Sequence, residues 1–314
     1  MVLIPDTDLD VFPLNLGGNV FGWTADRATS FAVLDAYAAA GGNFVDTADM
    51  YSAWVPGNAG GESETIIGAW LAERGNRDAV VVATKVGKLP GLEGLAPATV
   101  NGAVDDSLRR LGVDRIDLYY AHADDPTRPI EEIAATFDGL VRAGKVAAPA
   151  ASNFSPERVR AWVEHARANG LAAPVALQPR YSLVARAEYE SGTAAVAADL
   201  GLAVFPYSAL ASGFLTGKYR SGADAAGRAR GDAASRYLTP NGLRVLAALR
   251  PIADAHGVQP TSVALAWLLA RGVTAPIASA SRPEQVPPLI AATRLELTAD
   301  EVRLLDEASA PFAA

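Results

Sequence analysis

Short runs of β-branched and other apolar residues alternate along this chain with longer segments whose apolar positions recur at helical spacing. This alternation predicts repeated strand–helix units around a parallel sheet. We expect eight strands, at residues 12–18, 43–48, 79–86, 115–122, 145–152, 174–179, 202–207 and 273–279. Helices are expected near residues 27–40, 62–74, 97–111, 130–143, 156–169, 186–199, 260–271 and 282–292.

Eight such units predict an α/β fold of the (β/α)8 TIM-barrel type, in a single domain over residues 1–314. A doubly wound sheet fits less well, because it usually has fewer strands and a G-x-G-x-x-G turn after the first one. Residues 240–257 and 298–309 are predicted to be two added helices. Residues 219–238 are predicted to form a long loop, either mobile or able to close over a ligand.

Composition narrows the class of partner. The 27 basic and 35 acidic residues give a net charge of -8, so we expect a small-molecule partner rather than nucleic acid or a membrane surface. The chain has no cysteine, which excludes disulfides and metal binding through sulfur. The first residues do not resemble a secretory signal, and charges interrupt every apolar stretch, so we expect a cytoplasmic protein, either a monomer or a homo-oligomer.

Four reactive side chains fall at the ends of neighbouring predicted strands. Asp46 ends the second strand and Tyr51 follows it, Lys85 is near the end of the third strand, and His122 ends the fourth. Active sites of this fold form at the carboxyl ends of the strands, so these side chains should converge. Taken singly, each has a structural interpretation: a turn cap, a loop aromatic or a solvated strand end.

Together the four groups can deliver a proton to a carbonyl oxygen while a hydride reaches the carbon. A free tyrosine has a pKa of about 10, so Tyr51 needs a nearby ammonium group that stabilises its phenolate. Lys85 can provide that charge, with Asp46 as its counter-ion. A neutral His122 can orient the carbonyl by hydrogen bonding.

Several motifs resemble the aldo-keto reductase superfamily, in particular its bacterial long-loop members related to the potassium-channel β-subunit-like branch. GGNFVDTADMY (41–51) is similar to the signature that leads to the family's catalytic tyrosine. The resemblance continues through ESETIIGAWL (62–71), DDSLRRLGVDRIDLYYAH (105–122), GKV (144–146), SNF (152–154) and TGKY (216–219). It implies that Asp46, Tyr51, Lys85 and His122 are the catalytic tetrad, with Tyr51 as the general acid.

The resemblance also implies a nicotinamide dinucleotide, NADP(H) in preference to NAD(H). Ser152, Asn153 and Gln178 are implied to hold the carboxamide, and Tyr207 to stack on the ring. The full set of implied cofactor contacts is Gly17, Gly18, Asp46, Ser152, Asn153, Gln178, Tyr207, Ser208, Leu210, Ser212, Gly213, Lys218, Arg228, Ser279, Ser281, Arg282 and Gln285.

Some of these implied contacts have a second interpretation. The segment from Ser208 to Gly213 is implied to bind pyrophosphate, and Ser281, Arg282 and Gln285 to bind the adenosine ribose phosphate. Arg228 is interpreted equally well as a solvated arginine. Gly17 and Gly18 either let the backbone approach the nicotinamide ribose or simply form a turn.

Two stretches depart from the family pattern. The fifth strand contains Pro149, which removes one ladder donor and predicts a local distortion before Ser152. The loop SAWVPGNAGG (52–61) is long and carries Trp54. Trp54 and Trp23 either line a substrate pocket together with Tyr51 and His122, or only cover the barrel rim.

We therefore expect an NADP(H)-dependent oxidoreductase that reduces an aldehyde or ketone, or catalyses the reverse reaction. The alternative is a cofactor-binding, redox-sensing regulatory subunit with little turnover, like the potassium-channel β subunits. A metal-dependent hydrolase is disfavoured and no metal is expected, because His122 is the one histidine at a predicted strand end. The substrate itself stays open.

Overall fold

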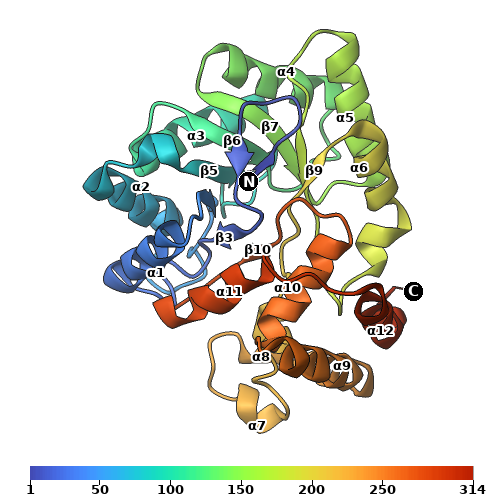
Figure 1. Ribbon diagram of the computed structural model, residues 1–314. Helices are drawn as coiled ribbons and strands as arrows, with labels where there is room; N and C mark the ends of the chain where they lie inside the picture. The colour runs from blue at the N-terminus through green and yellow to red at the C-terminus, as the bar shows by residue number, and fades with distance from the viewer. Residues whose placement is uncertain (314) are drawn as a thin grey trace.

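A curled sheet of eight parallel strands forms the centre of the computed structural model, which describes residues 1–313 (Figure 1). Its strands are β3 (Asn15–Gly17), β4 (Phe44–Asp46), β5 (Val81–Val86), β6 (Ile116–Ala121), β7 (Val146–Ser152), β8 (Ala176–Gln178), β9 (Ala203–Val204) and β10 (Ile277–Ala278). They lie in chain order, with β10 beside β3. The amides of Thr274 and Ile277 donate to the carbonyls of Val204 and Pro206 at 2.9 Å, which closes the sheet. The predicted (β/α)8 barrel is confirmed.

Helices surround the barrel (Figure 1). They are α1 (Arg27–Ala39), α2 (Glu62–Arg74), α3 (Pro97–Leu111), α4 (Ile130–Arg142), α5 (Pro156–Ala168), α6 (Ala194–Leu200), α10 (Pro260–Ala270) and α11 (Val286–Ala292). The two predicted added helices are present as α9 (Pro240–His256) and α12 (Ala299–Ser309), which pack against each other. Caps set their starts: Thr239 accepts a bond from Gly242 N, and Thr298 forms a capping box with Glu301.

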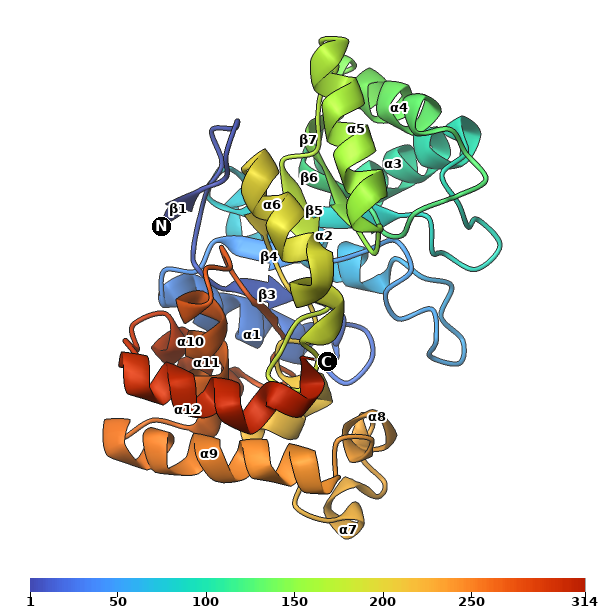
Figure 2. The same ribbon diagram turned by 90° about the vertical axis from the view of Figure 1, so that its right-hand side faces the viewer.

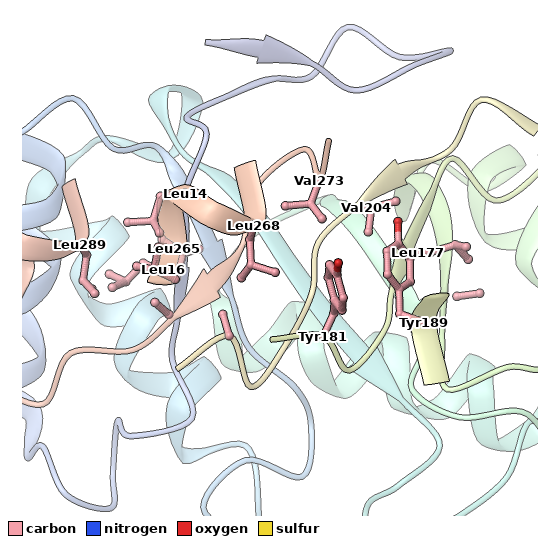
Figure 3. Close-up of a cluster of buried hydrophobic side chains, with 14 of the residues drawn as sticks. Leu14, Leu16, Leu177, Tyr181, Tyr189, Val204, Leu265, Leu268, Val273 and Leu289 are labelled. Carbon is pink, nitrogen blue, oxygen red and sulfur yellow. The ribbon is translucent and has the colours of Figure 1, made fainter. Parts of the chain in front are cut away.

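Two apolar layers hold the strands. Inside the barrel, Phe44, Leu118, Tyr120 and Phe205 are fully buried and belong to one cluster. Outside it, a second cluster joins the strands to the helices (Figure 3). The residues labelled there come from strands, loops and helices: Leu14, Leu16, Leu177, Tyr181, Tyr189, Val204, Leu265, Leu268, Val273 and Leu289. Because both faces of each strand are covered, the strands appear in the sequence as continuous apolar runs.

An N-terminal hairpin was not predicted. It consists of β1 (Val2–Leu3) and β2 (Asp10–Val11), which are antiparallel. Ile4 and Val11 are fully buried and join the cluster inside the barrel, so the hairpin plugs the amino-terminal end. Figure 2 shows the hairpin to the left of the barrel, while α7 (Gly222–Ala225) and α8 (Gly231–Ser235) lie to the right.

Other boundaries differ from the predictions. The strands predicted at 12–18, 202–207 and 273–279 are shorter, because their ends leave the ladder before the loops begin. The helix predicted from 186 starts with a π-helical turn, Tyr189–Thr193, and the one predicted from 282 starts with a 3-10 turn, Pro283–Gln285. The loop predicted at 219–238 contains α7 and α8, and a capping box of Ser221 and Asp224 starts α7.

The predicted distortion at Pro149 is wrong. Strand β7 continues through this residue, which lies opposite Tyr119 of β6, and its carbonyl accepts a bond from Val175 N at 3.0 Å. The missing donor is therefore tolerated within an unbroken strand, and Ser152 keeps its place at the strand end. No helix within residues 1–313 is long and apolar enough to cross a membrane.

Candidate active site

The predicted site residues lie at the carboxyl end of the barrel, away from the N-terminal hairpin. Asp46, Ser152 and Gln178 are the last residues of β4, β7 and β8, and His122 directly follows β6. Since all eight strands run in the same direction, their ends meet at one face. The loop after β4 projects on this side of the barrel, on the right in Figure 2.

Lys85 is the centre of the predicted tetrad. Its fully buried ammonium donates hydrogen bonds to Asp46 Oδ2 at 2.6 Å, to the Thr47 carbonyl at 2.6 Å and to the Tyr51 hydroxyl at 2.9 Å. Tyr51 in turn donates to Asp46 Oδ2 at 3.3 Å. The rings of Tyr51 and His122 lie 6.2 Å apart, centre to centre. The structure thus brings the four side chains together, as the strand-end argument predicts.

Burial controls the protonation of this cluster. Burial, followed by the Asp46 carboxylate, raises the pKa of Tyr51 well above its usual value. Burial lowers the pKa of Lys85, against the opposing effect of Asp46. Burial and the charges of Lys85 and Lys88 hold the pKa of His122 well below its usual value, so its imidazole is neutral. Tyr51 therefore keeps its proton in the free protein, and Lys85 Nζ, at 2.9 Å, lies where an ammonium can stabilise the phenolate as it forms.

Two tryptophans stand beside Tyr51. The Trp23 and Trp54 rings contact edge to face at 5.6 Å, and the Trp54 ring lies 6.1 Å from that of Tyr51. The loop that carries Trp54 is anchored locally, since Ser52 Oγ donates to the Phe21 carbonyl at 2.8 Å. Trp54 is 43% exposed. It therefore lies at the rim of the barrel and also next to the tetrad.

A hydrogen-bond network joins the ends of β7, β8 and β9 to the tetrad. Gln178 Nε2 donates to Asp46 Oδ1 at 2.8 Å, and Ser152 Oγ donates to the Gln178 carbonyl at 2.9 Å. Asn153 donates to the His122 carbonyl and accepts from the Tyr207 hydroxyl at 2.7 Å. These amide and hydroxyl groups, next to an aromatic ring, match the chemistry of a nicotinamide and its carboxamide.

The segment after β9 turns through an uncommon backbone conformation. Ser208, Ala211, Ser212 and Gly213 all have positive φ, at 56°, 49°, 58° and 90°. For a non-glycine residue this conformation costs roughly 1–2 kcal/mol, and such strain clusters at ligand sites. Successive amides in such a turn form a concave anion site. Half-buried Leu210 directly precedes the turn at Ala211.

Positive charge gathers beside this turn. A Cβ added to Gly213 would meet Lys218 Nζ at 3.1 Å. Partial burial lowers the pKa of Lys218, and so do the positive charges of Arg228, Arg230 and Arg282. No ion pair joins these four cations to an acidic side chain within residues 1–313. We call Ser208–Gly213, with Lys218, Arg228 and Arg282, the cationic cradle; it suits a ligand with several phosphates.

A sequence model of the Aldo/keto reductase family matches residues 13–310, nearly the whole barrel. The chain belongs to this family. The predicted resemblance to the aldo-keto reductases is thereby confirmed. Members of the family are oxidoreductases that generally use NAD(H) or NADP(H) and act on small molecules.

Three relatives show the breadth of the similarity. The uncharacterized oxidoreductase YrpG of Bacillus subtilis is 35% identical, over 96% of this chain and 93% of that protein. Protein tas of Escherichia coli is 33% identical, over 95% and 94%. The putative voltage-gated potassium channel subunit beta of Schizosaccharomyces pombe is 33% identical, over 84% and 79%.

At the ends of β3 and β10 this aldo/keto reductase is tightly packed. A Cβ on Gly17 would lie 2.7 Å from Ser279 Oγ, and one on Gly18 would lie 2.8 Å from Ser63 Oγ. Neither glycine has a positive φ. The Gly18 carbonyl accepts a bond from Phe21 N at 2.9 Å, so a turn does begin at Gly18, and close packing leaves little room for a side chain at either position.

The predicted contacts for the adenosine end lie before α11. Gln285 Oε1 accepts bonds from the backbone amide and the hydroxyl of Ser281, at 2.9 and 3.3 Å. Arg282 is exposed between them. This leaves its guanidinium accessible to a phosphate that approaches from solvent.

The long loop presents a different arginine from the one we predicted. Arg228 is exposed and donates to the Asp224 carbonyl of its own loop at 2.9 Å. Arg230 instead reaches the barrel mouth, where it donates to Asn19 Oδ1 at 3.0 Å. Sequence reasoning missed Arg230 and Asn19 because neither belongs to a motif, although Asn19 directly follows the Gly17–Gly18 pair.

Proposed function

We propose that this aldo/keto reductase is NADP(H)-dependent and reduces an aldehyde or ketone to an alcohol, or catalyses the reverse oxidation. The observation that carries the proposal is the position of the Tyr51 hydroxyl, which lies 2.9 Å from Lys85 Nζ, with the His122 ring beside the Tyr51 ring. A hydroxyl held between an ammonium and a carboxylate can release its proton to a substrate.

We also propose that residues 1–314 act as one barrel domain. The cytoplasmic location of the protein stays a prediction.

Each of the four tetrad residues has its own role in protonating the carbonyl oxygen. Tyr51 donates its hydroxyl proton to the carbonyl oxygen, and His122 orients that oxygen by donating an N–H. As negative charge develops on the phenol oxygen, the Lys85 ammonium stabilises it, while Asp46 holds Lys85 in position. When bound, the dinucleotide supplies the hydride to the carbonyl carbon, or accepts it in the reverse direction.

The donor groups around the mouth fit the dinucleotide. Ser152, Asn153 and Gln178 would hold its carboxamide, and Tyr207 would stack on the ring. The cationic cradle would bind the phosphates. Two cations favour NADP(H) over NAD(H). Arg282 is exposed and lies close enough to Lys218 to lower its pKa, and neither side chain has an acidic partner within residues 1–313. A further phosphate is the ligand that would neutralise them.

The test combines cofactor binding with turnover. We expect NADPH to quench the tryptophan fluorescence of the purified protein and to be consumed when a simple aldehyde is added. Tyr51→Phe should lower kcat by about 10²- to 10⁴-fold, the usual contribution of general acid catalysis, and keep the Kd for NADPH. Tyr119→Phe is the matched control, a buried tyrosine on strand β6. Normal turnover by Tyr51→Phe would disprove the mechanism.

The second candidate function is a cofactor-binding regulatory subunit. The similarity to the Schizosaccharomyces pombe protein favours it, because that protein is named as a channel subunit. NADPH binding without turnover of any aldehyde or ketone in a broad panel would support this role instead of catalysis.

A further inference from the structure

Arg230 occupies a position that the proposed chemistry does not use. It precedes α8, and its guanidinium donates to Asn19 Oδ1, which lies 211 positions earlier in the chain. Asn19 Oδ1 also accepts a bond from Ser279 Oγ at 2.6 Å. The guanidinium carbon lies 5.5 Å from the centre of the Trp23 ring. The long loop therefore places a cation at the barrel mouth, against the aromatic wall.

Arg230 has no counter-ion within residues 1–313. No carboxylate of residues 1–313 forms an ion pair with Arg230, although the side chain is partly buried. Burial lowers its pKa, while the hydroxyls of Tyr219 and Tyr51 act in the opposite direction. A partly buried guanidinium with one neutral acceptor is incompletely satisfied, since it has five donors. An anion brought to the mouth would complete it.

We propose that Arg230 binds a carboxylate of the substrate, so that this enzyme prefers aldehydes or ketones that carry a carboxylate group. The inference rests on the proposed function and adds a substrate class to it. The carbonyl would lie at Tyr51, the body of the substrate against Trp54 and Trp23, and the carboxylate at Arg230.

The position of Arg230 favours a substrate anion over a cofactor phosphate. Arg230 packs on Trp23, whose ring contacts Trp54, which in turn contacts Tyr51. The guanidinium and Tyr51 are also close enough to affect each other electrostatically. By contrast, Lys218 lies against Gly213 in the left-handed turn, where the phosphates are expected. Arg230 thus continues the aromatic wall that begins at the proposed acid.

The first experiment compares two aldehydes that differ in one carboxylate. Wild type should have a lower KM for 4-carboxybenzaldehyde than for benzaldehyde. Arg230→Gln should raise the KM for 4-carboxybenzaldehyde roughly tenfold or more, as expected for the loss of a charged hydrogen bond. Its KM for benzaldehyde and its kcat should stay within about twofold, and Arg230→Lys should recover part of the preference. Arg236→Gln, an exposed charge in the same loop segment, is the matched control.

The second experiment measures binding without turnover. Benzoate should change the tryptophan fluorescence of the NADP⁺-saturated protein at lower concentration than benzyl alcohol does, and Arg230→Gln should abolish that difference. The Kd for NADPH should be the same in wild type and Arg230→Gln. A weaker Kd for NADPH with no change in benzoate binding would assign Arg230 to a cofactor phosphate and overturn the inference.

The remaining outcomes separate this inference from the proposed function. If Arg230→Gln impairs both aldehydes equally, Arg230 only tethers the loop, and the inference fails while carbonyl reduction stands. If wild type reduces both aldehydes with equal KM, the inference also fails while carbonyl reduction stands. If no carbonyl compound is reduced, the proposed function fails. The benzoate titration then still decides whether Arg230 binds carboxylates.

Discussion

The tetrad and the cationic cradle lie at the same end of the barrel, but the cation of the tetrad is paired with a carboxylate and, within residues 1–313, the cations of the cradle are not. Lys85 is fully buried and forms a 2.6 Å ion pair with Asp46. Lys218 and Arg282 are exposed and have no acidic partner within residues 1–313. The tetrad is electrostatically complete before any ligand binds, whereas the cradle is complete only with a bound anion.

This difference in charge pairing assigns proton transfer to the tetrad and ligand binding to the cradle. A buried ion pair is expensive to disrupt, because the partner that remains is a charge without compensation in a low-dielectric site. An exposed cation that lacks a partner can be removed with little effect on folding. Substitutions in the tetrad should therefore change both stability and turnover, and those in the cradle should change affinity alone.

The largest effect is expected for Lys85→Met. Loss of the ammonium leaves Asp46 buried without a counter-charge, which should destabilise the fold by about 3–5 kcal/mol. Turnover should fall at least about a hundredfold, because the developing phenolate loses its stabilising charge. Urea unfolding and NADPH-consumption assays measure the two effects.

A double variant makes this prediction sharper. Asp46→Asn combined with Lys85→Met removes both charges, so it should recover much of the stability but none of the turnover. If the single variant were as stable as wild type, the tetrad would not be a tightly coupled pair. The contrast with the cradle would then disappear.

A smaller effect is expected for Asp49, a buried carboxyl group three residues after Asp46. Neither of its oxygens has a hydrogen-bond partner within residues 1–313, and burial and the nearby Glu64 carboxylate raise its pKa to about 7. The unfolded value is 3.8, so the folded state holds this proton more tightly. The stability that comes from the protonated group is present below pH 4 and is lost as the pH rises through 7.

Asp49→Asn should remove this pH dependence. Between pH 5 and pH 8, the unfolding free energy of wild type should fall by about 2–3 kcal/mol more than that of Asp49→Asn. Asp8→Asn, at an exposed position, should leave the wild-type pH profile unchanged. Parallel profiles for wild type and Asp49→Asn would show that Asp49 ionises normally, and that this end of the barrel tolerates an unpaired charge.

The same contrast explains what the sequence could predict. Each barrel strand is buried on both faces, so β5 is visible from the apolar run at residues 79–83. The carboxyl ends of parallel strands meet at one face of the barrel, so residues at those ends lie close together in space. For this reason the sequence alone was enough to place Asp46, Lys85 and His122 together. Tyr51 follows the same rule because it comes five residues after Asp46.

Positions that depend on short elements could not be predicted. The strands of the N-terminal hairpin have two residues each, too few for any periodicity, and burial of Ile4 becomes apparent only when the barrel closes over it. Arg230 lies between helices of four and five residues, and its direction depends on a contact with Asn19, 211 positions away. No local pattern carries that information.

The smallest effect is expected for Arg282→Gln, which removes one exposed charge from the cradle. If Arg282 binds the phosphate that distinguishes NADPH from NADH, the Kd for NADPH should rise roughly tenfold, and the Kd for NADH should not change. The salt dependence of NADPH binding should become weaker, while Tm and kcat at saturating NADPH stay constant, because no buried charge loses its partner. Arg294→Gln, another exposed arginine beyond α11, is the control. Equal weakening of both cofactors would instead place Arg282 on a phosphate that they share, and a lower Tm would show that the cradle, like the tetrad, also supports the fold.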